Sequence, residues 1–280
     1  MRFYFFEFLF IFLVFQNLSY AQDASHEWGS VNQIITQGQV SGEVRNFFMN
    51  TINEGHLNDY YTNALGFALR YETKSFYGFS IGAHFRSVFK AFGDPLSKEE
   101  QSLGRAAKWE YELYDLLDKD RDKDIHKLQE LYLKYQFGES YLNLGRIETE
   151  YTPLLNNSDG RMGPFAHQGF WLHHPLNKTS TLDVGFINRV SPRSTTEWFS
   201  LNADIGLFNN GFLNNGEEAN YQMTTNSQGL GVLKYTYSNS LWNLKAYDIY
   251  IHHLLNSIWL EADYTLNQWN IGAQYLYQQG

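Results

Sequence analysis

The feature that most constrains the fold of this chain is a series of short segments in which apolar and polar residues strictly alternate. Successive residues of a β-strand point to opposite faces, so such a segment forms a strand with one apolar face and one polar face. In residues 257–266 the apolar face is formed by Ile258, Leu260, Ala262, Tyr264 and Leu266. This repeated pattern is typical of an antiparallel, all-β transmembrane barrel that faces lipid outside and water inside.

About eleven strands are predicted, and the connections between them alternate in length. The predicted strands are residues 39–48, 64–73, 79–89, 128–137, 141–148, 169–174, 181–190, 228–237, 241–251, 257–266 and 269–279. Short turns alternate with longer loops at residues 50–63, 90–127, 149–168 and 191–227. Short periplasmic turns and long external loops are the layout of outer-membrane barrels.

The ninth predicted strand, residues 241–251, fits the pattern least well. Asp248 shares a face with the apolar residues Leu244 and Ala246. We therefore expect a β-bulge or a change of register near Asp248.

The N-terminus has the features of a secretory signal peptide. Arg2 precedes an almost wholly apolar run at residues 3–15, and small residues lie before a cleavage site expected after Ala21. The apolar run is shorter than the roughly 20 residues that a membrane-spanning helix needs. The predicted organisation is a signal peptide at residues 1–21, a periplasmic lead at 22–38 and a barrel domain at 39–280, which places the mature protein in the cell outer membrane.

The composition agrees with a barrel and narrows the possible partners. Aromatic residues make up 18% of the chain, yet its mean hydropathy is −0.43, and cysteine is absent. Aromatic girdles around a water-filled lumen explain this combination, since only every second strand residue must be apolar. A net charge of −9 argues against nucleic acid. The expected partners are outer-membrane lipid, lipopolysaccharide and small-molecule solutes, and both a monomer and a homotrimer remain open.

The last predicted strand, residues 269–279, still alternates near the end of the sequence. An unpaired strand edge cannot stand in hydrocarbon, and single-chain barrels usually have an even number of strands. We therefore expect that the barrel is incomplete at its C-terminal side and that this chain alone forms no stable channel. The alternative is that the strand count is wrong by one.

Four blocks of the sequence resemble the OprD-type family of outer-membrane porins. The main block resembles the third-loop signature of that family, and its residues are Gly145, Arg146, 152–156, Asp159, Arg161, Met162, Pro164, Phe165 and Gly169. The other blocks are residues 188–195 with Glu197 and Trp198, residues 38–45 and residues 71–79. The resemblance implies an 18-stranded barrel, of which this chain supplies little more than half, and a narrow channel for small, often carboxylate-bearing solutes.

The loop predicted at residues 149–168 is the expected constriction. It is rich in Asn, Asp and Gly, and prolines stiffen it where it leaves and rejoins the wall. Irregular backbone is tolerated in a lumen because water satisfies it, so the loop can fold inward. The residues predicted to line the passage are Pro153, Asn156 and Asp159, together with Arg146 and Arg161, which lie on either side of them.

Charged residues of both signs are predicted on the lumen faces of the strands. The basic ones are Arg45, Arg70, Arg86, Lys134, Arg189, Arg193 and Lys234, and the acidic ones are Glu43, Glu72, Glu130, Asp183, Glu261 and Asp263. Opposite charges across a narrow pore orient dipolar solutes, and guanidinium groups suit carboxylates. The alternative for each arginine is a structural ion pair that braces the wall.

Catalytic, metal and cofactor chemistry find no support in the sequence. The aspartates at positions 118, 120, 122 and 124 alternate like a calcium loop, but Lys123 and Gln129 stand where that loop needs Gly and Glu. We interpret this stretch as a solvated acidic loop that follows a short surface helix at residues 99–117. The predicted function is a passive porin rather than an enzyme, with no cofactor, and the alternative is a non-conducting barrel that serves adhesion or structure.

Overall fold

The computed structural model describes residues 31–55, 57–97, 107, 109–118, 123–155, 160–205, 207, 212, 215–218, 220 and 226–280. The predicted signal peptide, residues 1–21, lies outside the described residues, and the short helix α2, Val31–Thr36, falls within the predicted periplasmic lead. The described residues form one antiparallel sheet of 12 strands, so the prediction of an all-β antiparallel fold is confirmed.

Each of the eleven predicted strands is present, with bounds that differ from the prediction by a few residues at most. They are β1 Gln39–Thr51, β2 Tyr60–Glu72, β3 Phe79–Gly93, β4 Ile125–Phe137, β5 Ser140–Ile147, β6 Ala166–Asn177, β7 Ser180–Ser191, β9 Leu230–Ser238, β10 Trp242–Ile251, β11 Leu255–Leu266 and β12 Trp269–Gln279. A two-residue strand, β8 Phe199–Ser200, was not predicted and pairs with β7. It is followed directly by the short helix α3, Leu201–Ile205.

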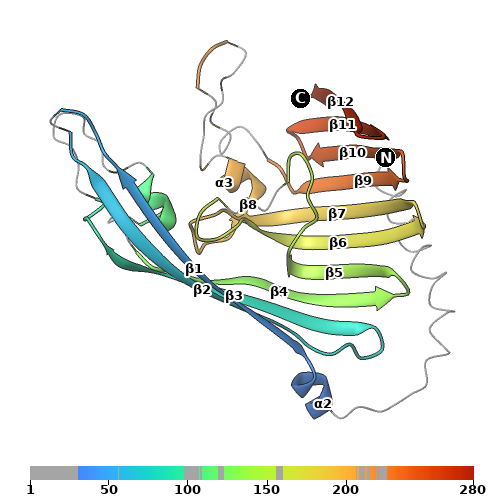
Figure 1. The fold of residues 1–280 in the computed structure, drawn as a ribbon, viewed down its shortest axis with the longest axis horizontal. Helices are drawn as coiled ribbons and strands as arrows, with labels where there is room; N and C mark the ends of the chain where they lie inside the picture. Colours follow the sequence, from blue (N-terminus) through green and yellow to red (C-terminus); the bar gives the residue numbers. More distant parts are fainter. Residues whose placement is uncertain are drawn as a thin grey trace.

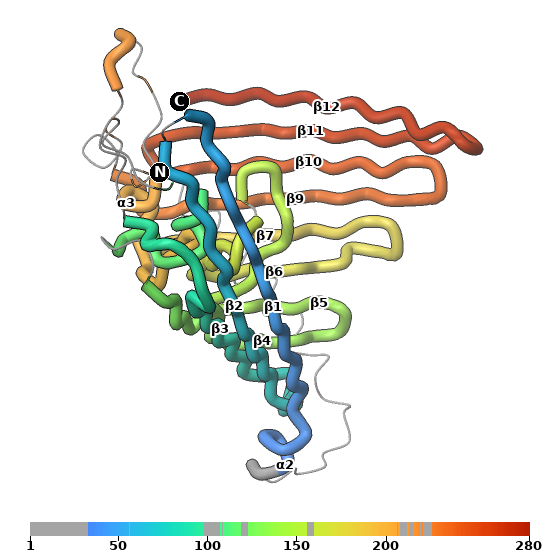
Figure 2. Tube along the Cα trace, turned by 60° about the vertical axis from the view of Figure 1, so that its left-hand side comes forward, coloured from blue at the N-terminus to red at the C-terminus, as the bar shows by residue number. Residues whose placement is uncertain are grey.

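Every long strand pairs with its neighbours in chain order, and β7 pairs directly with β9. The resulting sheet is strongly curved and open, with β1 at one edge and β12 at the other (Figure 1, Figure 2). Within the described ranges, no helix is long and apolar enough to cross a membrane.

The two faces of the sheet differ in the way that the alternation predicts. On β1, Val40, Val44 and Phe48 point outward and are 53% to 69% exposed, whereas Glu43 and Arg45 between them are partly buried on the inner face. The pairing register continues these two faces into β2, since the inward Glu43 lies opposite Ala68 and the outward Val44 lies opposite Phe67. The outer face is therefore apolar and exposed, and the inner face carries the charges.

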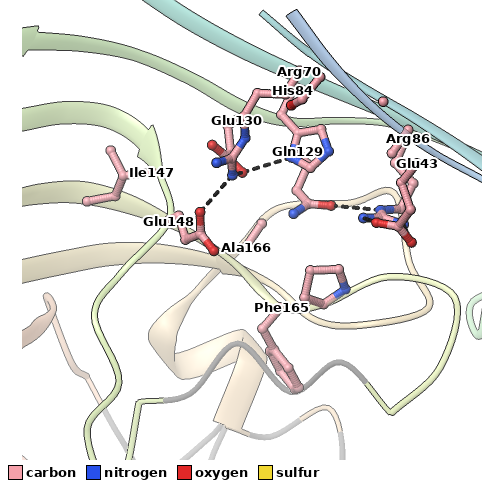
Figure 3. A pocket seen from close by; sticks show the side chains of 14 residues that line it. Glu43, Arg70, His84, Arg86, Gln129, Glu130, Ile147, Glu148, Phe165 and Ala166 are labelled. Atoms are coloured by element: carbon pink, nitrogen blue, oxygen red, sulfur yellow. Dashed lines mark hydrogen bonds and ion pairs between the residues drawn. The ribbon is translucent and has the colours of Figure 1, made fainter. Parts of the chain in front are cut away.

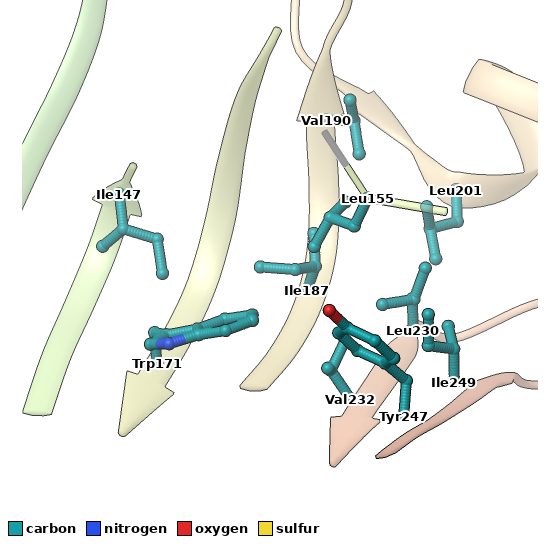
Figure 4. Close-up of a cluster of buried hydrophobic side chains, with 10 residues drawn as sticks. All are labelled: Ile147, Leu155, Trp171, Ile187, Val190, Leu201, Leu230, Val232, Tyr247 and Ile249. Atoms are coloured by element: carbon teal, nitrogen blue, oxygen red, sulfur yellow. The ribbon is translucent and has the colours of Figure 1, made fainter. Parts of the chain in front are cut away.

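Two buried apolar clusters lie on the inner face, and loop residues complete both. The Trp171 cluster lies on β5 to β10 and comprises Ile147, Leu155, Trp171, Ile187, Val190, Leu201, Leu230, Val232, Tyr247 and Ile249 (Figure 4). The Tyr114 cluster lies on β2 to β4 and comprises Tyr60, Ala64, Val88, Leu96, Ala107, Leu113, Tyr114, Ile125 and Met162. The loop between β5 and β6 contributes Leu155 to the first cluster and Met162 to the second.

The predicted irregularity at Asp248 is wrong. β10 keeps a continuous register with both neighbours, and Asp248 lies opposite Leu233 on β9 and Ile258 on β11. The prediction assumed that a carboxylate could not share a face with apolar residues, but Asp248 is exposed close to the end of the strand. Bulges or irregularities occur elsewhere, at the steps 63/64, 84/85, 168/169 and 175/177.

The predicted surface helix at residues 99–117 is also wrong over its described part. Residues 98–106 and 108 lie outside the described residues, and the rest contains only a 3₁₀-helix, η2 Glu110–Leu113, which ends where Tyr114 becomes extended. Leu113 and Tyr114 are fully buried in the Tyr114 cluster, and the Tyr114 hydroxyl lies 2.7 Å from Thr62 Oγ1. Burial of these side chains, rather than helix propensity, determines the backbone here.

Candidate functional site: a charged cavity beside the β5–β6 loop

A cavity of about 530 Å³ lies between the inner face of β1 to β4 and the two ends of the β5–β6 loop, residues 148–165 (Figure 3). Residues 156–159 of this loop lie outside the described residues. The strand register explains the lining: one inner row runs from Glu43 through Ala68 to Arg86, and the next runs from Arg70 through His84 to Glu130. The charged or titratable lining residues are Glu43, Arg70, His84, Arg86, Glu130 and Glu148.

Arg70 holds two carboxylates with a single nitrogen. Its Nη2 donates to Glu130 Oε1 at 2.5 Å and to Glu148 Oε2 at 2.7 Å. His84 Nδ1 lies 2.9 Å from the same Glu130 oxygen. The side chain of Glu130 is only 3% exposed, whereas those of Arg70 and Glu148 are 35% and 57% exposed. Arg70 and Glu148 therefore face the open part of the cavity, and Glu130 lies in the wall.

Arg86 is almost fully buried and uses all three of its guanidinium nitrogens. Nη1 and Nη2 donate to the two carboxylate oxygens of Glu43 at 3.4 Å and 3.3 Å, and Nε donates to Gln129 Oε1 at 3.2 Å. Nη1 also donates to the main-chain oxygen of Met162 at 3.2 Å. The close approach of the loop is favoured by Gly163, where a Cβ atom would come within 3.1 Å of Arg86 Cδ.

A second arginine of the wall holds the neighbouring loop residue. Arg45 Nη1 donates to the main-chain oxygen of Arg161 at 2.8 Å, while its Nε lies 2.8 Å from Glu43 Oε1. Farther back along the loop, Thr152 and Leu155 close a tight turn around Pro153 through hydrogen bonds of 2.9 to 3.1 Å. The predicted passage residues Asn156 and Asp159 lie outside the described residues.

Glu112, which the sequence analysis did not select, joins three loops. Its carboxylate accepts from Arg161 at 2.9 Å and from Arg193 at 3.2 Å, so it links the β3–β4, β5–β6 and β7–β9 connections. Ser194 donates its hydroxyl to the main-chain oxygen of Glu112, and its own main-chain oxygen accepts from the Leu116 amide at 2.8 Å. We call Glu112, Leu116, Arg161, Arg193 and Ser194 the Glu112 cluster. A glutamate in a predicted surface helix gave no signal of this role.

Most of the other predicted lumen charges lie in ion pairs or hydrogen bonds on the strands. The pairs are Glu72 with Lys134 at 3.4 Å, Asp183 with Lys234 at 3.6 Å and Glu261 with Lys245 at 3.1 Å, and Asp263 accepts from Asn243 at 3.4 Å. These contacts correspond to the wall-bracing alternative.

Arg146 and Arg189 lie apart from the cavity. The Arg146 guanidinium stacks 4.6 Å from the Trp198 ring centroid and donates to the Leu128 main-chain oxygen at 3.3 Å. Arg189 is exposed and pairs in register with Gln168 on β6 and Ser200 on β8. Their predicted contribution to the lumen stays a prediction.

A search of the described residues finds no group of three or more His, Cys, Asp or Glu residues that could hold a metal ion. The six titratable groups of the cavity instead bind one another, which suits a polar binding surface rather than a coordination site.

Comparison with solved structures identifies the class of fold. No family model and no curated protein matches the sequence. Among the similar solved structures are OccAB3 of Acinetobacter baumannii, with a TM-score of 0.64 at 14% identity over 87% of this chain and 58% of that one, and the outer membrane protein OpdK of Pseudomonas aeruginosa, with a TM-score of 0.61 at 16% identity over 88% and 57%.

A BenF-like porin from Pseudomonas fluorescens Pf-5 is also similar, with a TM-score of 0.62 at 13% identity over 88% of this chain and 58% of that one. The chain thus has the fold of the OprD-type outer-membrane porins, and the resemblance predicted from its sequence is confirmed for the fold. It spans somewhat more than half the length of the structures that it matches.

Proposed function

We propose that this chain forms the wall of an outer-membrane channel through which small hydrophilic solutes diffuse passively. The exposed apolar outer face suits lipid, and the charged inner face suits a water-filled lumen. Passage by diffusion requires no catalytic group and no cofactor. The similarity to porins supports the proposal through the shared fold.

The observation that carries the proposal is the attachment of the β5–β6 loop to opposite parts of the inner face. Leu155 packs in the Trp171 cluster, whereas Met162 packs in the Tyr114 cluster and accepts from Arg86 through its main-chain oxygen. A loop fixed at both places occupies part of the lumen cross-section. We infer that it narrows the passage and forces solutes toward the charged cavity.

The solutes that we propose carry a carboxylate group. Arg70 supports this choice because its guanidinium faces the open part of the cavity, and a guanidinium group binds a carboxylate through charge-assisted hydrogen bonds. OpdK, one of the similar proteins, has been solved with vanillate, which is a carboxylate. Among the predicted basic residues, Arg161 contributes by holding the loop through Glu112, since its guanidinium already has that partner.

Fractionation and planar-bilayer recording of the purified protein test the proposal. We expect the mature protein in the outer-membrane fraction and discrete ionic currents after reconstitution. Removal of positive charge by Arg70→Gln should shift the reversal potential across a salt gradient toward cation selectivity. Arg189→Gln, which removes an exposed guanidinium away from the cavity, is the matched control. A soluble periplasmic protein, or an outer-membrane protein without conductance, would overturn the channel and favour an adhesive or structural barrel.

A further inference from the structure

Arg70 and Glu148 are the charged pair of the cavity that a solute can reach most easily. The exposed fractions of the titratable lining side chains are 57% for Glu148, 39% for Glu43 and 35% for Arg70, and the remaining three are at most 12% exposed. Glu43 is engaged by both Arg45 and Arg86. Figure 3 shows Arg70 and Glu148 joined across the cavity, with Glu130 behind them.

Both members of this pair have hydrogen-bonding capacity to spare. Arg70 binds its two carboxylates through Nη2 alone, so its Nη1 and Nε groups have no partner among the described residues. Glu148 likewise uses only Oε2, which leaves Oε1 without a partner within the described ranges. By contrast, Arg86 has all three nitrogens engaged. One place in the cavity thus offers unused donors of a cation beside an unused acceptor of an anion.

From this geometry we propose that the Arg70–Glu148 pair is a binding site for a small zwitterion, such as an amino acid. The solute carboxylate accepts from the free N–H groups of Arg70, and the solute ammonium donates to Glu148 Oε1. This inference rests on the proposed function, because the solute reaches the pair through the lumen. The cavity volume of about 530 Å³ accommodates a molecule of that size.

Glu148 is the residue that gives the site its preference for a zwitterion over a simple anion. A bare carboxylate that approaches Arg70 meets two carboxylates, Glu130 and Glu148, that already balance the single guanidinium charge. Like charges at short range disfavour such a complex. An ammonium group on the same solute compensates for Glu148, so the zwitterion gains where the anion loses. Glu148 is therefore a specificity-determining residue.

L-Alanine and propionate test the proposal because they differ only in the ammonium group. Binding of each to the purified full chain in detergent is measured by titration calorimetry for the wild type, Glu148→Gln and Arg70→Gln. We expect the wild type to bind alanine about tenfold more tightly than propionate, as one charged hydrogen bond predicts. Glu148→Gln should remove that preference, and Arg70→Gln should weaken both ligands.

Glu261→Gln is the matched control, since it neutralises another carboxylate of the inner face, which is paired with Lys245 on β10. It should leave the alanine-to-propionate ratio unchanged. If Arg70→Gln fails to fold, Arg70→Lys keeps the charge beside Glu130 but loses the spare nitrogens, and it should weaken both ligands too. Equal affinities in the wild type, or an unchanged ratio in Glu148→Gln, refute the zwitterion site.

The same measurements keep the two proposals apart. A protein that conducts ions but has no alanine preference loses only the zwitterion site. A protein that binds alanine with the expected ratio but carries no current loses only the channel.

Discussion

Neutralisation of Glu112 should release the three loops that meet at the Glu112 cluster. Its carboxylate holds both Arg161 and Arg193, so Glu112→Gln keeps the size of the side chain but removes the charge that two guanidinium groups share. The two arginines then repel each other without compensation. We expect local opening of the loops while the strands remain paired.

The exposure of the three side chains sets the size of the effect. The side chain of Glu112 is 15% exposed, and those of Arg161 and Arg193 are 19% and 31% exposed. Ion pairs on an open surface contribute about 0 to 1 kcal/mol, and removal of one partner of a buried pair costs about 3 to 5 kcal/mol. The partly buried cluster lies between these limits, at about 2 kcal/mol. That cost corresponds to roughly 30-fold faster opening-limited exchange.

Hydrogen exchange at the Leu116 amide measures this opening directly. That amide donates to the Ser194 main-chain oxygen at 2.8 Å and is protected only while the two loops stay together. Glu261→Gln serves as the control, because its carboxylate is 13% exposed and belongs to an ion pair on β10 and β11. The reasoning fails if Leu116 exchanges at the wild-type rate in Glu112→Gln, or if the control accelerates it equally.

Three further changes probe other parts of the chain. Burial raises the pKa of Asp204 in α3 to about 6, so its stabilising protonation is complete below pH 4 and is lost as the pH rises through 6; hydrogen exchange of α3 should accelerate over that range by up to about 3 kcal/mol in opening free energy, and Asp204→Asn should abolish the pH dependence. Gly169→Ala should block folding, assayed by heat-modifiable gel migration, because its Cβ would lie 1.8 Å from the Phe186 oxygen, whereas Gly231→Ala, with 3.9 Å to its nearest neighbour, should fold normally. Met162→Ala should cost about 2 to 5 kcal/mol of loop attachment and expose the β5–β6 loop to protease without loss of the strands.

The strands could be predicted from the sequence because each one carries its own two-residue period. That signal is local, and it gave β1, β3 and β12 nearly to the residue. The two-residue strand β8 is too short to show a period, and it exists only because the chain returns to pair with β7. At Asp248 the period alone would have been sufficient, and the added expectation of a bulge was the error.

The cavity was predictable only in part. Glu43, Arg70 and Arg86 were selected because strand alternation assigned them to the inner face, and the structure brings all three to the cavity. His84 obeys the same alternation but was passed over, although it lies 2.9 Å from Glu130. Glu112 could not have been found, since its role depends on three loops that are distant in sequence and on the burial of η2 beneath them.

The two attachment points of the β5–β6 loop also affect how the curved sheet can fluctuate. Leu155 is held on the β5 to β10 part of the sheet and Met162 on the β2 to β4 part, so the loop is a tether between two regions of one flexible wall. A slow motion that flattens the sheet must pull one of these side chains out of its cluster, and that raises the energy of the motion. The width of the lumen and the position of the loop are therefore one coupled variable, and a substitution that loosens either cluster should soften both.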